Sequence, residues 1–139
     1  MAAIRKVLVG VDGSENALRA VELVADLAAS TGAKVTLLNV IAPSDSAVFS
    51  GKSSRPLEDR TMGDERLHAS AERMREKGVL FDTAVEFGHP AQVILGMAAQ
   101  GYDLVALGSR GLGSIEGFLM GSVSSRVVHH SQVPTLVVP

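Results

Sequence analysis

The stretch Asp103-Leu104-Val105-Ala106-Leu107-Gly108-Ser109-Arg110-Gly111 leads from a short apolar run into a glycine-rich loop. Residues 104–107 predict a buried strand, because a strand that is covered on both faces is apolar at consecutive positions. The loop extends to Gly121-Ser122-Val123-Ser124, and valines then recur with helical spacing. The stretch therefore predicts a strand, a glycine-rich loop and the first turn of a helix, in that order.

A glycine-rich loop that ends at a helix N-terminus favours the binding of an anion. Glycines let the backbone approach a ligand closely, and the first turn of a helix carries unpaired N–H groups and a partial positive charge. Phosphate is the usual occupant of such a site. Ser122 and Ser124 would add hydroxyl donors, whereas Arg110 is either a clamp on phosphate or a solvated charge of the loop. The alternative is that the glycines only form turns in a surface loop.

Two better-known phosphate-binding motifs do not match the stretch. A P-loop requires a lysine directly before its last serine or threonine, and Gly121 occupies that position here. The dinucleotide fingerprint Gly-x-Gly-x-x-Gly also fails, because Gly111 and Gly113 are followed by Gly117, one residue late. The spacing that is present is Gly108-x2-Gly111-x9-Gly121-Ser122.

Outside this stretch, apolar runs alternate with segments of helical periodicity. Strands are predicted at residues 7–11, 34–41, 79–87, 104–107 and 134–138. Helices are predicted between Ser14 and Gly32, over residues 57–77, from Pro90 to Gly101, and from Ser122 to near His130. The serine-rich residues 42–56 are expected to form a mobile loop, and the sequence leaves the role of this loop open.

This alternation predicts an α/β fold with a parallel sheet and helices on both of its faces. We expect one domain over residues 1–139, with the alternating strand at residues 79–87 on an edge of the sheet. In open sheets of this kind, ligands bind beyond the carboxyl ends of strands, where the strand order reverses. The loops that follow Val11, Val40, Phe87 and Leu107 are therefore the candidates for a binding crevice.

The composition argues against several functional classes. A formal net charge of −2 without a long basic run disfavours nonspecific nucleic-acid binding. The absence of cysteine excludes disulfides, thiol catalysis and cysteine-based zinc sites. The first apolar run is interrupted at Asp12, which makes it too short for a signal peptide or a membrane span. We therefore expect a cytoplasmic protein without nucleic-acid or membrane partners.

The glycine pattern resembles the ATP-binding signature of the universal stress protein family. The likeness extends over nearly the whole chain, from the opening Val-Leu-Val-Gly-Val-Asp-Gly-Ser at residues 7–14 to the closing residues 133–138. The resemblance implies a Rossmann-like fold, similar to the adenine nucleotide α-hydrolases, with five parallel strands in the order 3-2-1-4-5 and four helices. It also implies ATP, with Mg²⁺ carried by the phosphates, and a homodimer paired through Thr135–Val138.

The resemblance implies a role for each candidate binding residue. Asp12, flanked by Val11 and Gly13, would bind the ribose or the adenine end, and the backbone of Val40 would meet the adenine edge. The residues that would line the ribose and phosphates are Leu107, Gly108 and Gly111, with Arg110 beside them. The residues that would hold the phosphates are Gly121, Ser122, Val123 and Ser124.

The residues do not suggest dedicated catalysis. No nucleophile is paired with a base and an orienting acid, and Asp12 is the one carboxylate expected near the site. We therefore expect a nucleotide-binding regulatory protein of the stress response, with slow ATP hydrolysis at most and no metal ligands of its own. The alternatives are an enzyme that cleaves the α–β phosphate bond and a nucleotide-free dimerisation module. The sequence identifies no protein partner.

Overall fold

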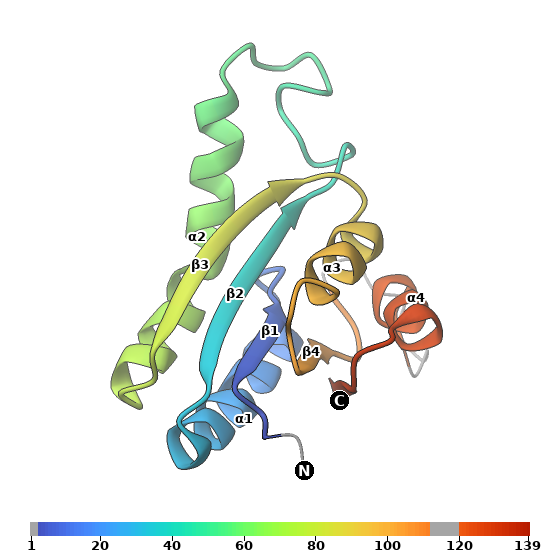
Figure 1. The fold of residues 1–139 in the computed structure, drawn as a ribbon. Helices are drawn as coiled ribbons and strands as arrows, with labels where there is room; N and C mark the ends of the chain where they lie inside the picture. Colours follow the sequence, from blue (N-terminus) through green and yellow to red (C-terminus); the bar gives the residue numbers. More distant parts are fainter. Residues whose placement is uncertain (1–2, 112–119) are drawn as a thin grey trace.

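The computed structural model describes residues 3–111 and 120–139, in which strands and helices alternate throughout (Figure 1). The elements are β1 (Lys6–Gly10), α1 (Glu15–Thr31), β2 (Lys34–Ile41), α2 (Pro56–Glu76), β3 (Phe81–Phe87), α3 (Pro90–Ala98), β4 (Leu104–Gly108), α4 (Ser122–His130) and β5 (Thr135–Val138). All neighbouring strands are parallel, and their order is β3-β2-β1-β4-β5. The expected fold class and strand order are therefore confirmed.

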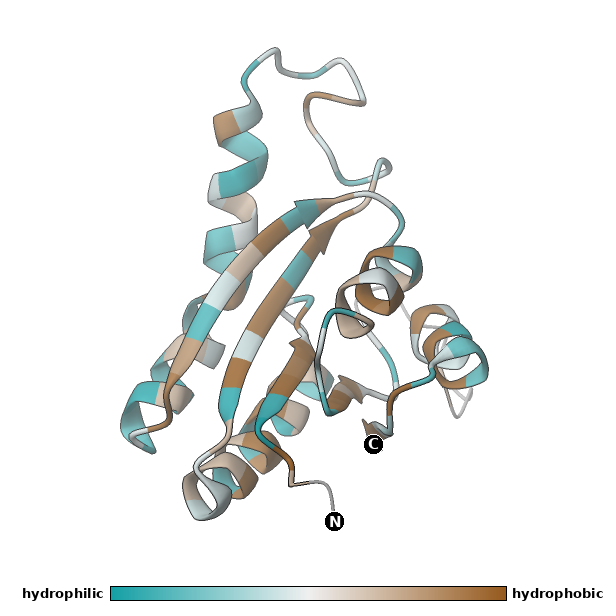
Figure 2. Ribbon diagram, in the orientation of Figure 1, coloured by the Kyte–Doolittle hydropathy of each residue, from teal (hydrophilic) through white to brown (hydrophobic). Residues whose placement is uncertain are grey.

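The sheet divides the core into two layers. Val7 and Val9 of β1 face one layer, together with residues of α1 and α2, while Leu8 faces the other layer with residues of α3 and α4. Figure 1 shows the same arrangement, with α1 and α2 behind the sheet and α3 and α4 in front. Figure 2 shows the apolar residues concentrated on the central strands and the hydrophilic ones on α2. The alternation of side chains along β1 thus supplies both halves of the core.

The limits of α1 follow from the residues at its two ends. The Ser14 hydroxyl accepts a hydrogen bond from the Ala17 N–H at 3.1 Å, which caps the first turn. Gly32 ends the helix with a φ of +78°, and its N–H donates to the Ala28 carbonyl. Both predicted helix signals are therefore confirmed.

The edge strand β3 differs slightly from its predicted bounds. It begins at Phe81 rather than at residue 79, because the ladder with β2 begins at the pair Val35 and Phe81. Val85 is buried, whereas Asp82 and Glu86 are exposed. This pattern confirms the expected edge strand with one wet side.

The loop between β2 and α2 contains turns but neither a helix nor a strand, as expected. Its first half is tied to α2 through Asp59, whose carboxylate accepts hydrogen bonds from the Ser46 hydroxyl and, at 2.7 Å, from the Ala47 N–H. Asp59 is 2% exposed. The sequence did not predict this attachment of the loop to the helix.

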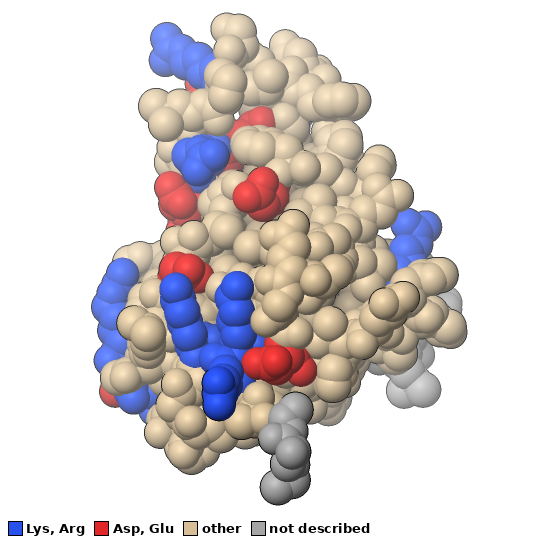
Figure 3. Space-filling view, in the orientation of Figure 1, with Lys and Arg blue, Asp and Glu red and all other residues tan. Residues whose placement is uncertain are grey.

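Charged side chains of both signs lie together at the end of the sheet where the strands begin. On the face seen in Figure 3, the basic side chains at this end have acidic neighbours. The ion pairs include Lys34 with Asp82 at 3.2 Å and Lys77 with Asp26 at 2.9 Å. Such exposed pairs contribute about 0–1 kcal/mol each to stability. No helix within residues 3–111 and 120–139 is both long and apolar enough to cross a membrane.

Candidate functional site

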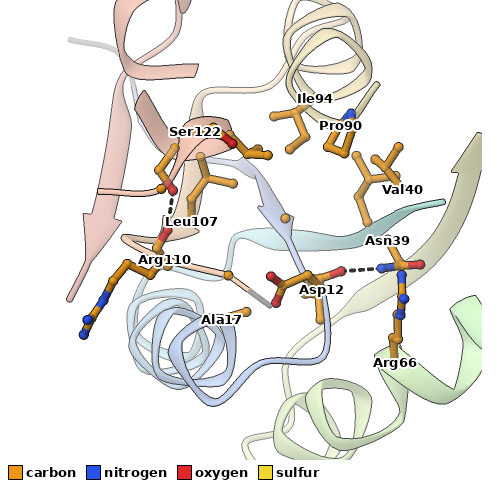
Figure 4. Close-up of a pocket in the computed structure, with 18 of the residues that line it drawn as sticks. Asp12, Ala17, Asn39, Val40, Arg66, Pro90, Ile94, Leu107, Arg110 and Ser122 are labelled. Carbon is orange, nitrogen blue, oxygen red and sulfur yellow. Dashed lines mark hydrogen bonds between the residues drawn. The ribbon is translucent and has the colours of Figure 1, made fainter. Parts of the chain in front are cut away.

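A cavity of about 430 Å³ lies at the carboxyl ends of the central strands (Figure 4). The chain leaves β1 toward β2 on one side, whereas β4 pairs with β1 on the other side, so the strand order reverses here. A crevice at this point is the general binding place of open α/β sheets. The lining residues are Gly10, Val11, Asp12, Ala17, Leu38, Asn39, Val40, Asp45, Arg66, Pro90, Ile94, Leu107, Gly108, Arg110, Gly111, Met120, Gly121, Ser122, Val123 and Ser124.

The structure brings all of the candidate binding residues except Gly13 to the wall of this cavity. Residues 112–119 of the predicted glycine-rich loop lie outside the described part of the chain. Gly13 instead forms the turn after β1, with a φ of +88°. A Cβ at this position would lie 3.3 Å from Cγ of Arg66, so this glycine leaves room for the Arg66 side chain, which lines the cavity.

Gly108 and Gly111 serve different purposes at the end of β4. A Cβ on Gly108 would lie 2.5 Å from Oδ1 of Asn16 and 2.8 Å from its backbone carbon. Gly108 therefore allows β4 to approach α1 closely. Asn16 then accepts a hydrogen bond from the Arg110 N–H at 2.7 Å, which holds the start of the loop. A Cβ on Gly111 would meet the Asp12 carboxylate, so Gly111 keeps the space beside that carboxylate clear.

The first turn of α4 forms one end of the cavity. Its N-cap, Gly121, has no side chain to cap the turn, and the Gly121 N–H donates to the Ser109 carbonyl at 2.6 Å. The Ser124 hydroxyl donates to the Gly108 carbonyl at 2.6 Å. The hydroxyl proton of Ser124 is therefore used in a hydrogen bond between α4 and β4. Its oxygen could still accept a hydrogen bond but could not donate one to an anion. Ser122 and the backbone amides of the turn are the better candidates for anion donors.

The opposite end of the cavity combines apolar side chains with polar ones, among them Asp12 and Asn39. Val40 and Ile94 are buried there. Oδ1 of Asp12 accepts hydrogen bonds from the Ser14 N–H at 2.9 Å and from the Ser14 hydroxyl at 2.6 Å. Asn39 donates from Nδ2 to the Val11 carbonyl at 2.7 Å. The two bonds from Ser14 orient the Asp12 carboxylate at the end of β1, and the bond from Asn39 holds the backbone just before it. Asp12 therefore both shapes the start of α1 and lines the cavity.

The sequence predicted that the loops after Val40 and Phe87 reach the crevice, but it did not single out Asp45, Pro90 or Ile94, and it did not predict that α2 takes part. Arg66 and Asp45 line the cavity, and Nη1 of Arg66 lies 3.8 Å from Oδ2 of Asp45. Pro90 and Ile94 complete the apolar wall. Arg66 follows Asp59 and Gly63 on α2 at helical spacing, but an apolar stripe does not identify a charged residue at such a position.

Among the described residues, the charged side chains that line the cavity balance one another. Asp12 and Asp45 are opposed by Arg66 and Arg110. Within the described residues, no group of three or more His, Cys, Asp or Glu side chains could hold a metal ion. A metal cation in the cavity would therefore be coordinated mainly by the molecule bound there and not by these side chains.

These features define a Rossmann-like α/β protein with a cavity at the switch point of its sheet. The chain belongs to the universal stress protein family, whose family model matches residues 3–139. A relative from Staphylococcus haemolyticus (strain JCSC1435), assigned to the same family, is 33% identical over 145 residues, which cover 99% of this chain and 86% of the relative.

Solved structures of the family are also similar. A universal stress protein in complex with cAMP superposes with a TM-score of 0.72 and 27% identity, over 99% of this chain and 98% of that one. A family member from Arabidopsis thaliana with AMP bound gives a TM-score of 0.69 and 25% identity, over 96% and 90% of the two chains.

Proposed function

We propose that this protein binds an adenine nucleotide in the cavity and acts as a nucleotide-dependent regulatory protein. The observation that carries the proposal is the meeting of the β4 loop and the uncapped first turn of α4 at the switch point. The cAMP and AMP complexes of two similar structures support an adenine nucleotide as the ligand. A volume of about 430 Å³ is within the usual range of small-molecule sites.

The nucleotide would be ATP, oriented by the chemistry of the two ends. Its phosphates would lie against Ser122, the first-turn amides of α4 and Arg110, where the helix dipole favours negative charge. Its base would lie in the apolar end beside Val40 and Ile94. Mg²⁺ would be carried by the phosphates, since the described residues offer no metal-binding group of their own.

The described side chains support binding more than turnover. Asp12 accepts two hydrogen bonds from Ser14, so it is positioned as a fixed acceptor at the cavity wall. Phosphoryl transfer needs metal ligands and a residue that orients the attacking water. We therefore expect ATP hydrolysis that is slow or absent, and regulation through the bound nucleotide.

A homodimer through β5 is part of the proposal. The carbonyls of Pro134 and Val138 accept hydrogen bonds from the N–H groups of Val105 and Ser109. Because backbone groups alternate sides along a strand, those of Thr135 and Val137 face the open edge of the sheet. A second copy that pairs with this edge would satisfy them and would bury an edge that otherwise invites association.

The nucleotide that copurifies with the protein provides the first test. Freshly purified protein would be denatured, and the supernatant analysed by mass spectrometry for ATP, ADP and AMP. Titration calorimetry with Mg-ATP would then give the affinity of the emptied protein. A clean supernatant together with no heat of binding contradicts the proposal. Steady release of AMP and pyrophosphate would instead identify an enzyme that cleaves the α–β phosphate bond.

A further inference from the structure

Arg66 is a cavity residue that lies outside the glycine pattern. It projects from the middle of α2, and its stem passes over the turn after β1. A side chain at Gly13 would lie 3.3 Å from Cγ of Arg66 and 3.5 Å from its Cβ. The absence of a side chain at Gly13 therefore lets Arg66 extend from α2 across the end of β1 into the cavity wall.

The guanidinium of Arg66 has a weak partner in the described part of the chain. Nη1 lies 3.8 Å from the Asp45 carboxylate, which is beyond hydrogen-bond distance. The Arg66 side chain is 19% exposed, whereas that of Asp45 is 48% exposed. A guanidinium has five N–H donors, and removing it from water is unfavourable unless these donors are paired. The donors are thus positioned for a ligand that enters the cavity.

The position of Arg66 indicates which part of the ligand it would meet. In Figure 4, Arg66 lies beside Asn39 and well away from Arg110 and Ser122, while Pro90 and Ile94 lie across the cavity from it. Arg110 and Ser122 belong to the end at which phosphates would bind. Arg66 therefore faces the end that would receive the nucleoside.

We propose that Arg66 contacts the nucleoside part of the bound nucleotide and is a specificity-determining residue of the site. The inference rests on the proposed function. A planar guanidinium stacks on an aromatic base and donates to ring nitrogens or hydroxyl groups. Arg66 would form one wall against the nucleoside, and the apolar side chains of α3 would form the opposite wall.

A series of ligands with different numbers of phosphates tests this placement. Calorimetry would compare adenosine, AMP and Mg-ATP on the wild type and on the variants Arg66→Gln, Arg110→Gln and Arg60→Gln. Arg66→Gln should weaken binding by about tenfold for each of the three ligands, because the lost contact is to the part that they share. Arg110→Gln should weaken ATP more than adenosine. Arg60 is exposed on the same helix, so Arg60→Gln controls for the lost charge and should change none of the affinities.

The results distinguish a contact of Arg66 to the nucleoside from a contact to the phosphates and from no contact. A loss in Arg66→Gln that is confined to Mg-ATP would assign Arg66 to the phosphates and overturn the inference, as would affinities equal to those of Arg60→Gln. Arg66→Lys keeps the charge without the planar fork and should weaken all three ligands by about threefold. If Arg66→Gln shows no thermal unfolding transition and is therefore not folded, the same comparison across the ligands is made with Arg66→Lys. A wild type that binds none of the ligands would contradict the proposed function instead.

Discussion

At the level of single residues, Gly111 leaves the space that the Asp12 carboxylate occupies. A Cβ on residue 111 would stand against Oδ2 of Asp12. We expect Gly111→Ala to displace this carboxylate and to weaken nucleotide binding by at least about tenfold, or 1.4 kcal/mol, while the chain still folds. Titration calorimetry and thermal unfolding measure the two effects.

Gly96→Ala is the matched control for this substitution. Gly96 is exposed within α3, and an added Cβ would meet nothing within 4 Å. Gly96→Ala should leave the affinity unchanged and raise the free energy of unfolding by about 0.5–1 kcal/mol, because alanine suits a helix interior better. If Gly111→Ala bound the nucleotide as tightly as the wild type does, binding would not depend on this position of the Asp12 carboxylate, and the prediction would be wrong.

Asp59 makes the stability of the protein depend on pH. The hydrogen bond from Ser46 lowers the pKa of the Asp59 carboxyl, burial opposes this shift, and the Ala47 N–H lowers the pKa further. A lowered folded-state pKa means that the unfolded chain binds more protons, so the contribution is complete above the ordinary value of about 4 and is lost as the pH falls below it.

The variant Asp59→Asn checks this dependence. It should be less stable than the wild type at pH 7, and the difference should shrink as the pH falls through the lowered pKa. Chemical denaturation from pH 7 to pH 3 measures both proteins. Asp64 is exposed on the same helix, so Asp64→Asn should not reproduce the effect. A difference that stays constant with pH would contradict the role of the ionised carboxylate.

At the level of elements, Gly63 sets how closely α2 packs on the sheet. Glycine is unfavourable in a helix interior by about 1 kcal/mol relative to alanine, which predicts that α2 is weakened here. A Cβ on Gly63 would lie 2.6 Å and 2.8 Å from the two methyl carbons of Val85 on β3. The structure thus supplies the reason for the glycine, since the short, branched Val85 side chain leaves no space.

Gly63→Ala should therefore destabilise the protein by about 1–3 kcal/mol, despite the gain in helix propensity. In the background Val85→Ala, where the opposing methyl groups are gone, the same change should be much less harmful. Urea unfolding of the four proteins of this cycle gives the coupling between the two sites. A single variant Gly63→Ala that is more stable than the wild type would refute the packing argument.

At the level of the whole molecule, the open edge of β5 is where two copies would meet. The N–H of Val137 faces this edge, whereas the Val138 carbonyl accepts a hydrogen bond from the N–H of Ser109, the residue after β4. Val137→Pro would remove an outward donor and leave the bond between Ser109 and Val138 in place. We expect a dimer for the wild type and a folded monomer for Val137→Pro in analytical ultracentrifugation. An unchanged dimer would place the interface elsewhere.

Much of the architecture could be predicted because it depends on local patterns. The continuous apolar run of β4 indicated a strand buried on both faces, and Ser14 and Gly32 marked the ends of α1. The bounds of β3 and α3 shifted by two or three residues, because strand ends depend on the partner strand and helix ends on the following turn. The glycine pattern likewise identified the part of the cavity wall that β4 and α4 supply, since its spacing places a loop next to a helix N-terminus.

The sequence by itself determined the order of the elements, their periodicity and the glycine-rich loop, because neighbours along the chain control these features. Only the tertiary structure decided that Arg66 and Asp45 join Asp12 at one cavity, that the Ser124 hydroxyl bonds to Gly108, and that Gly13 makes room for α2. Each of these contacts depends on how helices cross the sheet. That crossing is determined by the packing of both core layers together, and no local pattern of residues records it.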